Sequence, residues 1–435
     1  MYRTHLWAAA ALFVICGAAP AAFAQDASPE AYALPAGDAL VPAPVAWEAS
    51  AAHSVTGVWD SIFAVETESR DVFALNAADG KELWRKPAFY PPEKAMMHLP
   101  ATDGKRVWLA LTDTLYGLNA RDGKVLFEAP LDGEIEEDPT FVNGHVIAFV
   151  SKIEGDTGSR ERQFFVRDLD GTSGRIKASF SVGKAQQALF AVDREAMVCY
   201  VLLRKVDATA ADRFAAAAYQ FPGGQKIAAG TVGDVNGYPY AAVSRLAVAG
   251  PEGAAIYLKD KLDRPLNRFG RDLGRAVDIT INGKKAIFLQ GDRVSAADVN
   301  TPSIFWQFAI EGIAPGETPY LASSFFTTVG LRQVFPATTG AGPLIVAFDS
   351  QSGRNVRAAK GIDGVTAVTY FKNFLVVATG KKIIAVNLDK LVPLAKKEPS
   401  REAQKPAAAD EAPKKDDMKK DEGVKKDDKK KDDDE

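Results

Sequence analysis

Cysteine is scarce in this chain, which has two cysteines, Cys16 and Cys199, among its 435 residues. Cys16 falls in an N-terminal stretch that we expect to be removed, so the mature chain keeps one cysteine and forms no intramolecular disulfide. Cys199 lies in the apolar run of residues 197–203, which has the length of a β-strand, so we expect a buried and unreactive thiol. Stability must then come from a hydrophobic core, which a content of 47% hydrophobic residues allows.

Histidine is also sparse, and the three histidines of the mature chain, His53, His98 and His145, all lie in its first third. Their settings do not recur, so nothing indicates metal ligation or acid–base chemistry. The sequence contains no glycine-rich phosphate loop, no nucleophile elbow and no zinc-ligand spacing. A net charge of −3 gives no reason to expect a nucleic-acid partner. These absences favour binding over catalysis, and we expect neither catalytic residues nor a metal site.

The N-terminus has the features of an export signal. A basic start precedes the apolar run of residues 6–19, which is shorter than the roughly 20 residues that a membrane span needs. Ala22 and Ala24 supply the small residues of a signal-peptidase site, so we predict a signal peptide over residues 1–24 rather than a retained anchor helix. No small residue stands immediately before Cys16, which argues against a lipoprotein. We therefore expect a periplasmic or secreted protein without a membrane span after cleavage.

The C-terminus has a different composition from the rest of the chain. Residues 396–435 contain no Ile, Leu, Phe, Tyr or Trp, and residues 414–435 alternate short basic and acidic blocks. Such a segment cannot bury enough apolar surface to offset the entropy of ordering it. A single helix with paired charges is the alternative, but the Asp content and the missing apolar face argue against it. We predict a disordered Lys/Asp-rich tail over residues 395–435.

An internal repeat of the hairpin type occupies the rest of the sequence. Residues 72–84 read Val-Phe-Ala-Leu-Asn-Ala-Ala-Asp-Gly-Lys-Glu-Leu-Trp, and residues 115–127 repeat the pattern as Leu-Tyr-Gly-Leu-Asn-Ala-Arg-Asp-Gly-Lys-Val-Leu-Phe. An apolar strand, an Asp-Gly turn and a second strand ending in an aromatic describe a β-hairpin, because glycine supplies the positive φ of the turn. Further copies lie at residues 165–180, 218–227, 256–269, 294–306, 344–357 and 383–388.

About eight units at a spacing near 45 residues match the four-strand blade of a β-propeller. We predict an all-β fold over residues 45–394, a β-propeller of about eight four-stranded blades, with seven blades as the alternative. Residues 25–44 would be a linker. Because the last copy is truncated, we expect residues 45–48 to close the ring as a strand and so remove an open sheet edge. The Ala-rich residues 208–218 are an exception that favours a short helical excursion.

The repeat resembles that of the PQQ-like β-propeller family, whose motif is an aliphatic strand with Ala and Asp, a turn ending in Gly, and a closing Trp. Residues 72–84 match this motif nearly residue for residue. The resemblance extends over the whole predicted propeller. In the family the closing aromatic docks between neighbouring blades, which implies that Trp84, Phe127 and Trp306 are inter-blade packing residues.

The resemblance leaves two classes of function open. Quinoprotein dehydrogenases use pyrroloquinoline quinone and calcium in the central channel, whereas non-catalytic propellers similar to BamB present their loops to protein partners. Many quinoprotein alcohol dehydrogenases carry a pair of adjacent cysteines, which this chain lacks. We therefore expect no cofactor and favour a monomeric protein-binding or scaffold module of the cell envelope, with a role in outer-membrane protein assembly as its sharper form. The missing lipoprotein signal weakens that form, and the quinoprotein stays as the alternative.

Three charged segments are candidate contact sites. Residues 134–138 could bind a cation or a basic partner, or form an exposed inter-blade loop with solvated charges. Residues 168–170 place two Asp close together, but no Glu occupies the twelfth position of a calcium loop, so an ordinary turn is favoured. The densest basic patch in the folded region is a possible contact for an acidic partner or a set of solvated loop arginines. It consists of Arg264, Arg268, Arg271 and Arg275.

Overall fold

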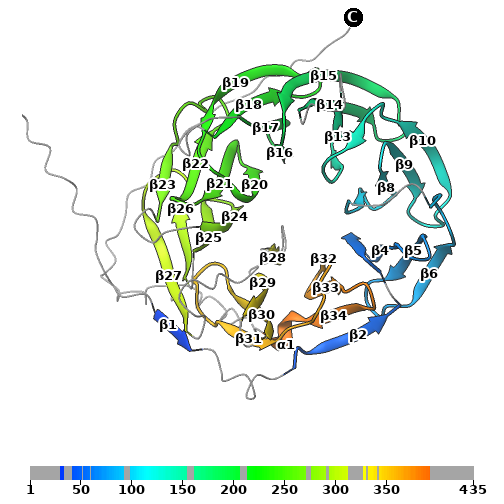
Figure 1. Cartoon of the computed structure of the whole chain (residues 1–435). Helices are drawn as coiled ribbons and strands as arrows, with labels where there is room; N and C mark the ends of the chain where they lie inside the picture. Colours follow the sequence, from blue (N-terminus) through cyan, green and yellow to red (C-terminus); the bar gives the residue numbers. More distant parts are fainter. Residues whose placement is uncertain are drawn as a thin grey trace, which may run out of the picture. The chain divides into compact units, whose positions relative to one another are not determined.

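The repeats fold into eight β-sheets of mainly antiparallel strands that stand in a ring around a central axis (Figure 1). A computed structural model of the chain describes residues 30–33, 42–50, 52–58, 60–92, 98–153, 161–205, 213–270, 276–290, 293–311, 327–329, 332–339 and 342–391. The ring confirms the predicted all-β propeller, and it has eight blades rather than seven. The predicted signal peptide and the predicted tail lie outside the described residues, and residues 395–435 form a unit of their own.

Each blade is one sheet whose strands, A to D, follow one another from the centre of the ring outward. Blade 1 contains β3 (Ser54–Val58), β4 (Ser61–Glu66), β5 (Asp71–Asn76) and β6 (Glu82–Lys86). Blade 2 contains β7 (Ala101–Thr102), β8 (Arg106–Leu111), β9 (Thr114–Asn119) and β10 (Val125–Pro130). Blade 3 has a divided strand A, β11 (Glu134–Ile135) and β12 (Thr140–Val142), followed by β13 (His145–Lys152), β14 (Arg162–Asp170) and β15 (Ile176–Ala185). Blade 4 contains β16 (Ala188–Asp193), β17 (Val198–Arg204), β18 (Phe214–Gln220) and β19 (Gln225–Val232).

The other four blades follow the same plan. Blade 5 contains β20 (Asn236–Ala242), β21 (Arg245–Gly250), β22 (Gly253–Leu258) and β23 (Asn267–Phe269). Blade 6 contains β24 (Ala276–Asn282), β25 (Lys285–Gln290), β26 (Arg293–Asp298) and β27 (Ile304–Glu311). Blade 7 contains β28 (Thr327–Val329), β29 (Arg332–Thr339), β30 (Gly342–Asp349) and β31 (Arg357–Lys360). Blade 8 contains β32 (Ala367–Phe371), β33 (Phe374–Ala378), β34 (Ile383–Asn387) and β2 (Val45–Ala49), and the short helix α1 (Leu388–Leu391) follows β34.

Blade 8 closes the ring because it combines strands from both ends of the propeller sequence. Strand β2 pairs antiparallel with β34, with Val45 opposite Val386 and Ala49 opposite Ile383. The predicted closing strand is therefore confirmed. Closure stabilises a propeller because it leaves no blade face and no blade edge open at the join.

Neighbouring blades are joined by aromatic rings that lie on turn glycines. Gly123, in the turn between β9 and β10, has a φ of +69°, and a Cβ placed on it would come within 2.7 Å of the Trp84 ring. Only glycine fits under such a ring and adopts this φ without strain. The Asp-Gly turn and the closing aromatic are thus two halves of one contact. Four further rings cover the turn glycine of the next blade: Trp47 on Gly80, Phe127 on Gly174, Phe180 on Gly224 and Trp306 on Gly353.

The carbonyl of the same turn also receives a hydrogen bond across the blade junction. The Trp84 Nε1–H donates to the Ala120 carbonyl at 2.8 Å. Phe127 has no N–H to donate, and at its junction Trp108 of β8 supplies one, from Nε1 to the Gly171 carbonyl at 3.1 Å. Between blades 5 and 6 the amide of Asn267 donates to the Val299 carbonyl at 3.2 Å. Because different side chains can satisfy this buried acceptor, the repeat motif can diverge while the fold persists.

Two segments differ from the sequence-based expectation. The predicted helical excursion is wrong for residues 214–218, which belong to strand β18, whereas residues 208–212 lie outside the described ranges. Pairing with β17 and β19 on both sides, and burial of Ala216 and Ala218 against blade 5, outweigh the helix propensity of alanine. Within the segment expected to be a linker, β1 (Glu30–Ala33) pairs in parallel with β27.

Candidate binding groove

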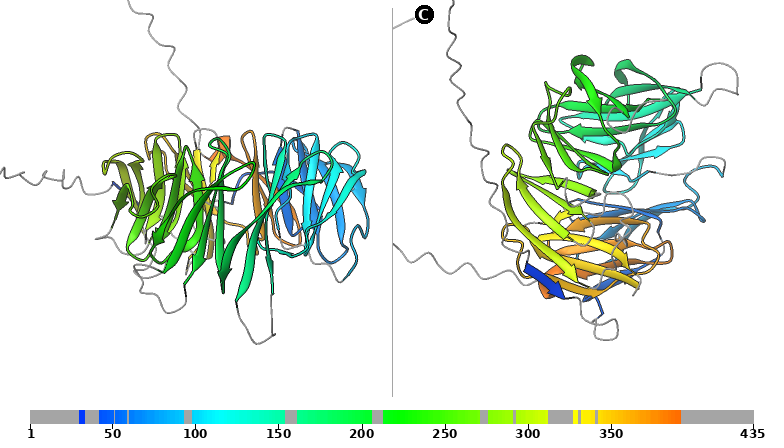
Figure 2. Two further views of the ribbon diagram at one scale, coloured as in Figure 1. Left: turned by 90° about the horizontal axis from the view of Figure 1, so that it is seen from above. Right: turned by 60° about the vertical axis from the view of Figure 1, so that its left-hand side comes forward.

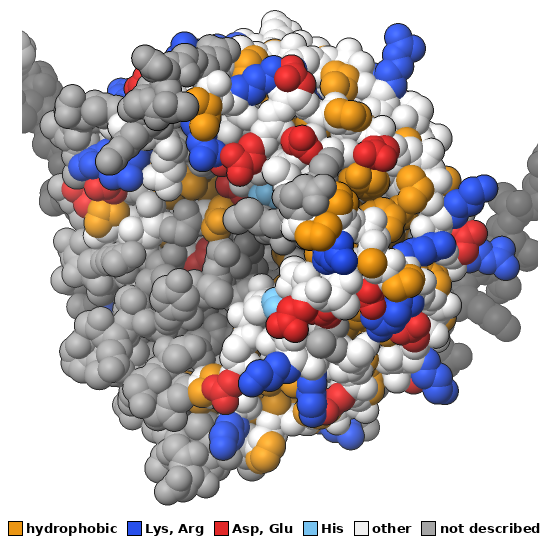
Figure 3. All heavy atoms as spheres, turned by 45° about the vertical axis from the view of Figure 1, so that its right-hand side comes forward, with side chains coloured by type: hydrophobic (Ala, Val, Ile, Leu, Met, Phe, Trp, Pro, Cys, Tyr) orange, Lys and Arg blue, Asp and Glu red, His pale blue; other side chains and the backbone are white. Residues whose placement is uncertain are grey.

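We call the side of the ring that carries the B–C turns and the blade-to-blade connections the upper face. Blade 3 has the longest described strands, since β14 has 9 residues and β15 has 10, against 6 and 5 for β5 and β6 of blade 1. Figure 2 shows the strands of blades 3 and 4, in green, reaching beyond the other blades on one side of the ring. Elsewhere, the surface in Figure 3 carries interspersed acidic and basic side chains around a central hollow, without a broad area of one sign.

Two adjoining pockets open on the upper face next to these long strands. One cavity of about 460 Å³ lies between blades 3 and 4, and a second of about 300 Å³ lies between blades 4 and 5. Gln187 lines both, so we treat them as one feature, the blade 3–5 groove. The larger pocket is lined by Glu136, Ile153, Arg162, Phe164, Gln186, Gln187 and Ala188, and the smaller by Gln187, Arg204, Phe214, Asp234, Val235, Asn236 and Pro251.

The charges of the larger pocket are held in pairs. Nη1 of Arg162, at the start of β14, lies 2.6 Å from Oε1 of Glu136 and 3.1 Å from Oε2 of Glu134. The Ser151 hydroxyl also donates to Glu136. Residues 134–138 therefore lie within the divided strand A of blade 3, on β11 and the segment after it, rather than in an inter-blade loop, and two of their carboxylates pair with Arg162.

Glu137 is the carboxyl of this segment with a strongly altered pKa. Burial, with a smaller effect from the charges of Asp138 and Glu136, raises the pKa of Glu137 to about 8. Asp138 itself accepts the Leu99 N–H at 2.8 Å and lies 3.6 Å from Nδ1 of His98. The segment between β11 and β12, beside the groove, thus carries one carboxyl that is largely protonated at neutral pH.

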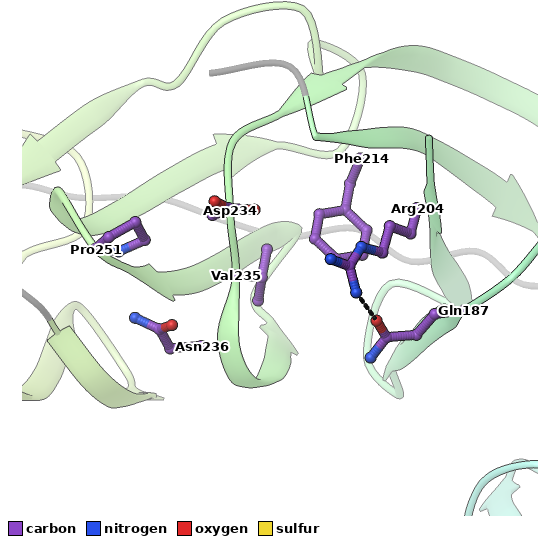
Figure 4. Close-up of a pocket in the computed structure, with 7 residues that line it drawn as sticks. All are labelled: Gln187, Arg204, Phe214, Asp234, Val235, Asn236 and Pro251. Carbon is purple, nitrogen blue, oxygen red and sulfur yellow. Dashed lines mark hydrogen bonds between the residues drawn. The ribbon is translucent and has the colours of Figure 1, made fainter. Parts of the chain in front are cut away.

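The smaller pocket combines charged, amide and apolar groups from blades 4 and 5. Figure 4 shows Arg204 and Gln187 from blade 4 facing Asp234 and Asn236, and the Arg204 Nη1–H donates to Gln187 Oε1 at 3.1 Å. Arg213 forms an ion pair with Asp234, with Nε 3.3 Å from Oδ1. Phe214, Val235 and Pro251 supply the apolar part of the lining. Such a mixture can accept both the backbone and the side chains of a polypeptide.

The structure places the other residues singled out from the sequence away from this groove. Trp84, Phe127 and Trp306 lie between blades, on the turn glycines described above. Arg264 is exposed in the connection between β22 and β23, and Arg268 on β23 lies 3.6 Å from Glu252 Oε2. The remaining two members of the basic patch, Arg271 and Arg275, lie outside the described residues, so the grouping of the four stays a prediction.

His145 and Cys199 have packing roles. Nδ1 of His145 lies 2.7 Å from Oδ1 of Asp168, which is fully buried at 0% exposure, so Asp168 takes part in a buried pair rather than in a calcium loop. Cys199 is buried as expected, and burial raises the pKa of its thiol to about 12. Over the described ranges, no group of three or more His, Cys, Asp or Glu side chains is arranged to hold a metal ion.

Sequence reasoning had identified only Glu136 among the residues of the groove. The other lining residues come from strand ends and connections of three blades, at positions where the repeat motif has no fixed residue type. The sequence feature that could have indicated the groove is the length of two connections: β13–β14 and β17–β18 are joined by longer segments than the corresponding strands of blades 1 and 2.

Residues 68–212 match the family model described as "Outer membrane protein assembly factor BamB", PQQ_2. No curated protein matches the chain in sequence. Among solved structures, BamB from Moraxella catarrhalis is 16% identical, with 76% of this chain and 92% of that chain covered and a TM-score of 0.52. The computationally designed Ika8 protein is 12% identical, covers 79% of this chain and 99% of that chain, and gives a TM-score of 0.59.

A quinohemoprotein alcohol dehydrogenase, ADHIIG from Pseudomonas putida HK5, is 12% identical, with 85% of this chain and 80% of that chain covered and a TM-score of 0.53. At these identities the likeness concerns the fold alone. The described helix, α1, is far too short to cross a membrane. The eight-bladed ring shows that the chain folds as a β-propeller, and residues 68–212 of that propeller resemble the PQQ_2 family model.

Proposed function

We propose that this propeller is a protein-binding module and that the blade 3–5 groove is its binding site. The groove carries the proposal, because two adjoining pockets offer arginine, carboxylate, amide and aromatic groups from three blades on one face. A rigid ring holds these groups in place, so recognition needs no catalytic set of residues. The match of residues 68–212 to an assembly-factor model supports the same class of function.

The cell envelope is the proposed place of action. The predicted signal peptide supports a periplasmic or secreted location, and the matched family model is described as an outer-membrane protein assembly factor. In the sharper form of the proposal, the partner is a component of outer-membrane protein assembly.

Charge reversal in the groove tests the proposal. Arg204→Glu places a carboxylate in the smaller pocket, which Asp234 also lines. Arg121→Glu is the control, because it makes the same charge change at the exposed turn between β9 and β10 of blade 2, on the face of the ring opposite to the groove. We expect affinity purification from an envelope extract to recover one defined partner with the wild type and with Arg121→Glu. Recovery should fall about tenfold or more with Arg204→Glu, because an unfavourable charge in a binding site costs over a kcal/mol. Equal recovery of the partner with all three proteins would show that the groove is not the binding site.

A titration distinguishes the alternative of a quinoprotein dehydrogenase. We expect no saturable change in the absorption spectrum of pyrroloquinoline quinone when it is titrated, with calcium, against the full chain. Stoichiometric binding together with dye-linked alcohol oxidation would replace the binding proposal by the enzymatic one. No specific feature of the described residues favours that outcome.

A further inference from the structure

The apolar junction between blades 2 and 3 contains an arginine. Arg167, on β14, is paired directly with Ala148 of β13, and residues opposite each other in a sheet lie on the same face. Ala148 packs in the hydrophobic cluster that joins the two blades, with Ala129 and Leu131 from blade 2, so Arg167 also faces blade 2. Arg167 is 8% exposed, and arginine stays protonated in proteins. The junction therefore buries a positive charge.

The described residues leave the charge of Arg167 largely uncompensated, although the strands around it, β10, β13, β14 and β15, are described in full. Its Nε atom is completely buried and donates no hydrogen bond to them. Burial lowers the pKa of Arg167, and the charge of Asp132 offsets this only in part. Asp132 is itself in an ion pair with Lys152. Because arginine is seldom buried without a partner, this one indicates a site for an anion.

The ring of Phe165 lies beside two cations. Cζ of Arg167 is 4.9 Å from the centre of this ring, and Nζ of Lys152 is 5.5 Å from it. A ring face attracts positive charge, but this contact is weaker than the paired hydrogen bonds between a guanidinium and a carboxylate. Because Lys152 and Asp132 cancel each other, the group carries one net positive charge. It matches an anion of single charge, and the apolar surroundings strengthen the attraction.

We propose that Arg167, Lys152 and Phe165 form a binding site for a single carboxylate group at the junction between blades 2 and 3. The Arg167 guanidinium donates to the carboxylate, Lys152 adds a second positive charge, and the ring of Phe165 forms a wall of the site. A phosphate dianion fits less well, because only one positive charge is left uncompensated. The site lies on the opposite face of blade 3 from Phe164, which packs toward blade 4 and lines the groove, so the inference does not depend on the proposed function.

Thermal unfolding of the full chain in sodium acetate tests the site, at pH 7 and with sodium chloride keeping the ionic strength constant. The wild-type Tm should rise with acetate concentration and level off, because a ligand that binds only the folded chain stabilises it. Arg167→Met should remove this rise. It should also raise Tm in chloride alone, since an apolar side chain of similar length replaces an uncompensated buried charge. Arg175→Met, at an exposed position of the same blade, is the matched control and should keep the response to acetate.

Asp132→Asn tests the charge argument at an exposed position, because the Asp132 side chain is 84% exposed and its replacement leaves the interior intact. The variant leaves Arg167 and Lys152 both uncompensated, so the apparent Kd for acetate should fall about threefold or more. A full acetate response in Arg167→Met overturns the proposal, and so does an unchanged Kd in Asp132→Asn, whatever the stability of the methionine variant. Tighter binding of inorganic phosphate than of acetate overturns the choice of a carboxylate.

A short peptide distinguishes two sources of the carboxylate. N-acetyl-Gly-Glu-Gly amide has a single carboxylate, which belongs to a side chain. If it binds at least as tightly as acetate, the site takes an acidic side chain of a partner. If acetate raises Tm and the peptide does not, the site takes a small free carboxylic acid.

Discussion

Three different side chains satisfy the same turn carbonyl at three blade junctions of this propeller. Trp84 donates to Ala120, Trp108 takes over where Phe127 cannot donate, and Asn267 serves the junction between blades 5 and 6. A buried carbonyl left without a donor costs about 1–3 kcal/mol, which explains why these junctions keep a donor even where the repeat motif is lost.

Substitution of Trp84 separates the two parts of this contact. Trp84→Phe keeps a ring on Gly123 and loses the N–H, so we expect the free energy of unfolding to fall by about 1 kcal/mol. Trp84→Ala also removes the ring and should cost about 3 kcal/mol or more. Urea unfolding monitored by circular dichroism measures both values. A Phe variant as unstable as the Ala variant would show that the hydrogen bond, and not the ring, holds the blades together.

The altered pKa of Glu137 gives the stability a pH dependence of known sign. Burial raises the pKa of Glu137 from 4.5 to about 8, so between these values the folded chain keeps a proton that the unfolded chain has lost. The stabilisation is complete below about pH 4.5 and is lost as pH rises toward 8. Thermal unfolding at several pH values should show Tm falling with pH over this window in the wild type. Glu137→Gln should reduce this dependence of Tm on pH. An identical dependence in both proteins would show that Glu137 does not have the raised pKa. Asp278, whose pKa burial raises to about 7, should leave a residual slope.

At the scale of the strands, a β-bulge comes before several of the docking aromatics. Between β5 and β6 the pairing passes from Trp84, opposite Ala74, to Glu82, opposite Leu75, so Leu83 is the additional residue. The same shift precedes Phe127 and Trp306. A bulge re-aims the next side chain and increases the local twist, which turns the aromatic toward the following blade. The outer strand is thus shaped to reach its neighbour.

The contact between an aromatic ring and the turn glycine of the next blade also joins the two ends of the ring, at the closing strand β2. Trp47 on β2 lies on Gly80 and donates to the Ala77 carbonyl at 3.1 Å, so it joins the end of the ring to blade 1. We expect Trp47→Ala to lower the free energy of unfolding by about 3 kcal/mol and to open blade 8 before the rest of the ring. Limited proteolysis should then cut near residues 42–50 well before global unfolding. Trp84→Ala is the matched control, and cleavage at the same place and rate in both variants would contradict a special role of the closure.

The strands show which parts of the fold could be predicted from the sequence. The hairpins at residues 72–84 and 115–127 were predictable, because Asp-Gly and an aromatic at fixed spacing are local signals. Strand β18 was not, because its alanines are helix formers in isolation and become a strand only between two packed neighbours. Strand β1 could not be predicted either, since its partner β27 lies more than 270 residues farther along the chain.

At the scale of the whole molecule, the groove depends on the arrangement of blades and not on a motif. Arg162, Arg204 and Asp234 belong to three different blades and come together only because the ring places consecutive blades side by side. The sequence could indicate that loops would carry the function, but not which loops meet.

Site-specific photocrosslinking is the most direct test of the central claim, that the blade 3–5 groove binds a partner protein. A photoreactive residue replaces Ile153, which is 62% exposed and lines the larger pocket, or, as a matched control, Leu126, which is 44% exposed on the outer strand of blade 2. The account predicts one defined adduct from position 153 in envelope extract, none from position 126, and loss of the adduct when Arg204→Glu is added. The same adducts from both positions, or an adduct that survives Arg204→Glu, would contradict it.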